Sequence, residues 1–156
     1  MSTRTSTMAT LPLQEDTLMK TKLIGYWVTT IIVALELLVG GVTDLVHGRE
    51  VLFAGEPVAL VLTQLGYPVY LLTILGVWKL LGTIALLVPR FPRLKEWAYA
   101  GAFFEMTGAA ASHAVRGGDP GTVIWLLIVV VFIVASWALR PPSRTLGVLF
   151  QARAHA

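Results

Sequence analysis

The chain has 156 residues, 56% of them hydrophobic and only 13% charged, and its net charge is +3. Soluble domains carry about 25% charged residues, so the composition excludes a chain that faces water along most of its length. The length fits one domain and leaves no room for a separate soluble catalytic domain. The absence of cysteine excludes thiol redox chemistry, disulfides and iron–sulfur ligation by this chain.

The first 22 residues are mostly polar and lack the order of basic, apolar and small residues that marks a cleaved signal peptide. We expect residues 1–22 to form a tail without ordered structure. Met19, followed by Lys20-Thr21-Lys22, offers an alternative start. The sequence therefore leaves open whether the native chain begins at Met1 or at Met19.

Four segments are long and apolar enough to cross a bilayer, which takes about 20 mostly apolar residues. They run over residues 23–46, 67–88, 96–115 and 122–139, and each of the last three stops before a proline or a pair of glycines. A shorter helix is expected after Pro57, lying at the membrane interface. We therefore predict an all-α fold: an integral membrane four-helix bundle over residues 23–140, followed by a cytoplasmic tail over residues 141–156.

Basic residues alternate between the two sides of this arrangement. Successive tails and loops carry three, one, three, one and three of them, and only Lys79 falls outside the pattern. The members are Arg4, Lys20 and Lys22; Arg49; Arg90, Arg93 and Lys95; Arg116; and Arg140, Arg144 and Arg153. By the positive-inside rule, both termini are expected in the cytoplasm. Basic loops beside an anionic membrane surface also explain the net charge without a nucleic-acid partner.

Three ionisable residues lie near the middle of predicted spans: Glu36, Lys79 and Glu105. Such a residue costs about 2.5–3.5 kcal/mol at a helix centre, and intramembrane charge marks function by default. Each lies on a stripe with small or polar residues at helical spacing, so the three are expected to face the bundle interior. The stripes are Glu36, Gly40, Thr43 and His47; Leu72, Gly76, Lys79 and Thr83; and Gly101, Glu105, Gly108 and Ser112.

One lysine neutralises one carboxylate, so the second carboxyl group of this trio is expected to hold a proton at neutral pH. Glu36, Lys79 and Glu105 are therefore the candidate catalytic residues of a general acid–base or proton-relay site. The alternative is a polar lock that fixes the register of the helices and carries no chemistry.

A second polar group is expected at the outer ends of the first and third spans. Its members are Asp44, His47, His113, Arg116 and Asp119. Two histidines and two aspartates are weak candidates for a metal site, because no metal-binding motif accompanies them, and we predict no metal. Helix caps and loop hydrogen bonds, or a mouth above the buried charges, remain as alternatives. Nothing beyond the number of histidines supports a haem.

Several stretches resemble the DoxX-like family. They are residues 65–68 (Leu-Gly-Tyr-Pro), 75–82 (Leu-Gly-Val-Trp-Lys-Leu-Leu-Gly), 85–89, 95–101 and 108–113 (Gly-Ala-Ala-Ala-Ser-His), and the resemblance covers about residues 19–140. It implies a bacterial inner-membrane protein of four helices and favours Lys79 and His113 as site residues, whereas Glu36 and Glu105 lie outside the matched stretches. The family has no settled activity. Its name links it to membrane sulfur oxidation and quinone reduction, and some relatives are associated with oxidoreductase complexes.

Three functions remain open from the sequence. The first is binding of a lipophilic ligand, quinone- or isoprenoid-like, at the buried charges, with proton transfer to or from it. The second is a non-catalytic membrane subunit or scaffold for an oxidoreductase complex, or a homo-oligomer, in which the charges only set helix register. The third is a small oligomeric transporter, although no internal repeat supports it. The cofactor, with quinone as one candidate, and the existence of any enzymatic activity are not specified by the sequence.

Overall fold

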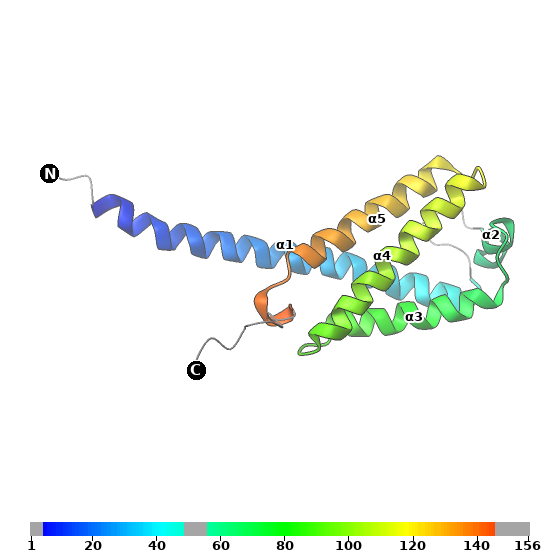
Figure 1. Ribbon diagram of the computed structural model, residues 1–156, viewed down its shortest axis with the longest axis horizontal. Coiled ribbons are helices and arrows are strands. Elements are labelled where there is room, and N and C mark those ends of the chain that lie inside the picture. Colours follow the sequence, from blue (N-terminus) through cyan, green and yellow to red (C-terminus); the bar gives the residue numbers. More distant parts are fainter. Residues whose placement is uncertain (1–4, 49–55, 146–156) are drawn as a thin grey trace, which may run out of the picture.

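The computed structural model describes residues 5–48 and 56–145 of the chain. Within these residues the fold is all-helical, as predicted (Figure 1). The helices are α1 (Thr5–Leu45), α2 (Val58–Gln64), α3 (Tyr70–Leu87), α4 (Pro92–Val115), α5 (Pro120–Ala138) and the 3-10 turn η1 (Pro142–Arg144). The predicted short helix after Pro57 is α2. Arg4, Arg49, Arg153 and the tail from residue 146 onward lie outside the described residues.

Three helices are long and apolar enough to cross a membrane. These are α1 over Thr17–Leu45, α3 and α5. Helix α4 covers the predicted third span, but its many alanines and glycines, together with Glu105 and His113, make it less apolar, and it is not among the three. The three apolar helices indicate a membrane protein, while the fourth span stays a prediction.

Helix α1 begins much earlier than the first predicted span. It starts at Thr5 and not near Leu23, so it includes most of the segment for which we expected no ordered structure. No glycine or proline lies between Leu13 and Leu23 to end the helix. In Figure 1 this N-terminal part of α1 extends well beyond the other helices.

The four long helices pack in a ring, in which α1 and α4 each contact both α3 and α5. Their shared core contains Val33 and Leu37 of α1, Leu86 of α3, Tyr99, Ala102 and Met106 of α4, and Val129 and Ile133 of α5. Large apolar side chains also cover the outside of the ring, as the exposed Trp78 and Phe104 illustrate. An apolar outer surface is what a bilayer solvates, so the ring has the polarity of a membrane protein.

Glycines bring α1 and α3 into close contact. A Cβ atom on Gly76 would lie 2.8 Å from Cγ of Leu45 and 2.9 Å from the backbone oxygen of Gly41. A Cβ on Gly41 would lie 3.1 Å from the backbone oxygen of Gly76. Small residues at such an interface let two backbones approach, which is a main source of helix association in membranes.

The C-terminal end of α3 is capped by a lysine from α4. The ammonium of Lys95 donates hydrogen bonds to the backbone oxygens of Ala85 (2.8 Å), Leu86 (2.7 Å) and Val88. These carbonyls have no partners within the helix, and the lysine that satisfies them is only 1% exposed. Burial lowers the pKa of Lys95 from its ordinary 10.5 to about 8, and the nearby charges of Arg144 and Arg140 add to the effect.

We predict that Gly76→Ala destabilises the protein by about 1–3 kcal/mol, because the added methyl group meets backbone that cannot move aside. Gly101→Ala is the matched control on α4, where a Cβ has nothing within 4 Å. The control should be neutral or more stable by up to about 1 kcal/mol, because alanine favours the helix. Thermal unfolding of both variants in a mild detergent measures the difference, and equal midpoints would contradict a glycine-dependent α1–α3 contact.

We also predict that Lys95→Met lowers the free energy of unfolding by about 2–3 kcal/mol through the loss of charge-assisted hydrogen bonds. The unfolded chain binds the Lys95 proton more tightly than the folded chain, so this residue's contribution to stability should rise with pH between about 8 and 10.5. Unfolding midpoints of wild type, Lys95→Met and the exposed control Lys22→Met across that range test the sign. If the stability difference between wild type and Lys95→Met shrinks as pH rises, the predicted sign of the pH dependence is wrong.

Candidate functional site

A buried ammonium group joins three helices. Lys79 of α3 places its Nζ 2.7 Å from Oδ2 of Asp44 on α1 and 3.1 Å from Oε1 of Glu105 on α4. The three side chains are only 8–17% exposed. At this burial each charge depends on the others, because a charge removed from water without a partner costs several kcal/mol.

The α1 glycines make room for this contact. A Cβ on Gly40 would lie 3.4 Å from Nζ of Lys79, and one on Gly41 would lie 3.0 Å from its Cβ. The lysine side chain therefore lies along α1 where α1 has no side chains. Asp44 follows Gly40 by four residues, which places its carboxylate on the same face, next to the ammonium.

The structure brings together two of the three predicted catalytic residues, and Asp44 joins them. Lys79 and Glu105 contact each other directly. Glu36 lies two helical turns before Asp44, and in the described part of the chain its carboxylate has no hydrogen bond or ion pair, although it lies near enough to interact with the charge of Lys79. Asp44, which we had grouped with the outer residues, is instead the closest partner of the lysine.

A cavity of about 340 Å³ lies beside the ion cluster. Its polar wall carries Glu36, Thr43, Asp44, Lys79, Glu105, Ser112, His113 and Thr122. Its apolar wall comes from α2, α3 and the segment that joins them, with contributions from α4 and α5, and includes Val58, Val61, Leu62, Leu65, Leu71, Leu75, Phe104, Met106 and Leu126. Ligand cavities typically combine mostly apolar walls with a few convergent polar groups, and this one has that composition.

Tyr67 and Ser112 join the α2–α3 connection to α4 at the cavity wall. Their hydroxyl oxygens are 2.9 Å apart, and both residues line the cavity. The connection also approaches Arg116 at Gly66, whose positive φ of 89° suits glycine and where an added Cβ would lie 3.3 Å from Cζ of the Arg116 guanidinium. Sequence reasoning had not identified Tyr67 as a site residue, since a tyrosine near a span end is ordinarily an interfacial anchor.

The predicted outer cluster is divided among different environments. His113 lines the cavity, and Asp119 caps α5 by accepting a hydrogen bond from the Thr122 backbone N–H at 2.9 Å. His47 is exposed at the end of α1, with a φ of 50°. Across the described ranges, no group of three or more His, Cys, Asp or Glu side chains is arranged to hold a metal ion.

The ring of helices and the charged cavity inside it define a small helical membrane protein with a polar interior site. A model of the DoxX-like family matches residues 28–138, so the chain belongs to the DoxX-like family. This confirms the resemblance found in the sequence. No curated protein and no solved structure matches the chain.

We predict that Lys79→Met costs about 3–5 kcal/mol of stability, because it leaves Asp44 and Glu105 without their counter-ion. Glu36→Gln should cost far less, since no ion pair is lost. The triple variant Asp44→Asn, Lys79→Met, Glu105→Gln should recover much of the loss, because it buries no unpaired charge. Thermal unfolding in one detergent compares them, and a triple variant less stable than Lys79→Met would contradict the ion-pair explanation.

Proposed function

We propose that this DoxX-like membrane protein binds a small lipophilic ligand, quinone- or isoprenoid-like, in the cavity and exchanges a proton with it. The observation that carries the proposal is the Lys79 ion cluster on the wall of an otherwise largely apolar cavity. A volume of about 340 Å³ is at the lower end of the range for small-molecule sites. It suits a single ring or a short isoprenoid segment, with the rest of a longer ligand outside.

Lys79 is the group that would orient the ligand. An ammonium has three N–H donors, and in the part of the chain that the structure describes, Asp44 and Glu105 accept from Nζ. The remaining donor is free for a ligand oxygen such as a quinone carbonyl. Because the two carboxylates fix the position of the ammonium, the donor is preorganised and little order has to be created on binding.

Glu36 and Glu105 are the proposed proton donor and acceptor. Glu105 forms an ion pair with Lys79, whereas the carboxyl group of Glu36, which faces the same cavity, has no ion pair among the described residues. Three carboxyl groups and one ammonium line the cavity, so at least one carboxyl group is expected to hold a proton there. Ser112, Tyr67 and His113 form a polar path from these groups toward the outer part of the cavity.

The membrane arrangement is part of the proposal. We infer four spans, with α4 as the third, in a bacterial inner membrane with both termini in the cytoplasm. Support comes from basic residues at the ends of the helices. Arg90 follows α3, Arg93 and Lys95 lie at the beginning of α4, and Arg140 follows α5. These helix ends lie on one side of the ring (Figure 1). Such clustering of basic residues is typical of a cytoplasmic face.

We expect protein purified in mild detergent to carry a stoichiometric lipophilic ligand, detected by native mass spectrometry, solvent extraction and an absorption spectrum of the same sample. Lys79→Met should lose most of it, because the orienting donor is gone. Glu36→Gln should retain the ligand but lose proton uptake or release on binding, measured in weakly buffered solution. Lys22→Met, a lysine change far from the cavity, is the matched control for the first variant.

Unchanged ligand content in a folded Lys79→Met protein would overturn the proposal. A wild-type chain that carries only bulk lipid but copurifies with an oxidoreductase subunit would support the subunit function instead. If that partner is still recovered after Asp44, Lys79 and Glu105 have been neutralised, the three charges serve only to fix the register of the helices.

A further inference from the structure

At the other end of the helices from the cavity, three cations lie near one another, and one of them pairs with a carboxylate. The cations are Lys95 of α4, Arg140 just after α5 and Arg144 of η1, and the carboxylate is Glu96 of α4. We name these four residues the basic junction. Among the described residues, Glu96 forms an ion pair with Arg140 alone, at 2.8 Å. The junction therefore has more positive than negative charge among the described residues.

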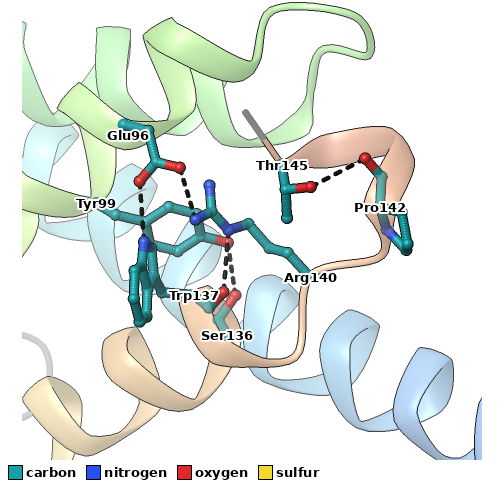
Figure 2. Close-up of polar contacts among 7 residues, drawn as sticks. All are labelled: Glu96, Tyr99, Ser136, Trp137, Arg140, Pro142 and Thr145. Atoms are coloured by element: carbon teal, nitrogen blue, oxygen red, sulfur yellow. Dashed lines mark hydrogen bonds and ion pairs between the residues drawn. The ribbon is translucent and has the colours of Figure 1, made fainter. Parts of the chain in front are cut away.

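Arg140 is held in the junction with one nitrogen left over (Figure 2). Its Nη2 donates to Glu96 and its Nε to the backbone oxygen of Trp137 at 3.0 Å. The guanidinium also lies over the ring of Tyr99, 5.0 Å from its centre, and the residue is only 9% exposed. Within the described residues, Nη1 is buried and has no hydrogen-bond partner. A buried donor without a partner costs about 1–3 kcal/mol, so this nitrogen indicates a missing acceptor.

Arg144 is partly exposed and is paired with no carboxylate in the part of the chain described. Its Nη1 donates to the Tyr26 hydroxyl (3.2 Å) and to the backbone oxygen of Leu86 (3.3 Å), and its guanidinium stacks over Trp27 at 4.6 Å. Both acceptors are neutral, so no described residue compensates the charge of Arg144. Burial is the main cause of the lowered pKa of Lys95, and the nearby charges of Arg144 and Arg140 lower it further.

A mostly apolar groove adjoins the junction. It lies between α4 and α5, has a volume of about 250 Å³, and contains Glu96 and Trp137 among its lining residues. The rest of the lining is Tyr99, Ala100, Phe103, Phe104, Ile133 and Val134. The Trp137 indole donates a hydrogen bond to Glu96 at 2.9 Å, so the groove and the basic junction share residues.

We propose that the basic junction binds the headgroup of an anionic phospholipid, with one acyl chain in the α4–α5 groove. Arg144 supplies the uncompensated charge for the phosphate, and Nη1 of Arg140 is the buried donor that lacks an acceptor. The adjoining apolar groove distinguishes a lipid from a soluble anion, which would make no use of it. Trp27 and Trp137 belong to the residue type that marks the headgroup level of a bilayer, which fits a site at that depth. The basic junction contains none of the lining residues of the Lys79 cavity, and the groove shares Phe104 with that cavity. The proposal does not depend on the function proposed for the cavity.

The test compares delipidated protein supplied with phosphatidylglycerol or phosphatidylcholine of identical acyl chains, using native mass spectrometry and thermal unfolding. We expect phosphatidylglycerol to bind about tenfold more tightly, since each basic group near a membrane surface contributes roughly 1 kcal/mol toward an anionic lipid. Arg144→Gln should remove most of that preference. Arg93→Gln, an exposed arginine at the same end of the helices, is the matched control and should keep it.

Three results would overturn the proposal. Equal binding of the two lipids would show that the protein does not recognise an anionic headgroup. An equal loss of the preference for phosphatidylglycerol in Arg144→Gln and Arg93→Gln would indicate diffuse surface charge without a site. A thermal shift of the same size with inorganic phosphate alone would show that the site binds a soluble anion and not a lipid.

The variant Ala100→Leu keeps the test informative if Arg144→Gln does not fold, because it fills the groove from an exposed position. It should weaken binding of both lipids and preserve the preference between them.

Discussion

A lysine ammonium placed among apolar helices needs negative partners, and this requirement organises the interior of the protein. Lys79 finds them on two other helices, Asp44 on α1 and Glu105 on α4. Three long helices thereby meet at one point, and their relative rotation is fixed by charge as well as by packing. Because the attraction between charges is strong where water is scarce, the contact specifies a single arrangement of helices that individually have apolar surfaces on nearly every side.

Much of this arrangement follows from the sequence, because apolar length and helical spacing are local properties. The helices from about residue 23 onward, the short helix after Pro57 and the inward position of Lys79 and Glu105 could all be predicted. The choice of Asp44 over Glu36 as the lysine's partner could not, because both lie on the same side of one helix and the outcome depends on how far α1 slides along α3. Gly41 and Gly76 set that slide through backbone contact. A signal was present, since Asp44 lies one turn beyond Gly40 on the face the lysine needs.

The basic end of the molecule was harder to predict for another reason. Lys95, Arg140 and Arg144 were read from sequence only as loop charges that orient the protein in the membrane. In the structure Lys95 donates hydrogen bonds to the backbone carbonyls at the end of α3. Arg140 packs over the ring of Tyr99 and forms an ion pair with Glu96. Hydropathy treats such residues as hydrophilic and exposed, whereas their long side chains allow deep burial once carbonyls, rings and carboxylates converge from several helices.

Gly108 belongs to the cavity wall, but a Cβ there would touch none of the neighbouring helices, because nothing lies within 4 Å of the position it would occupy. Helix packing therefore places no restriction on a methyl group at this position, whereas the volume of the cavity does. A methyl group at residue 108 would occupy space at the cavity wall and leave α4 in its place. The volume of the cavity can thus change by substitution at one residue, independently of the glycines that hold α1 and α3 together.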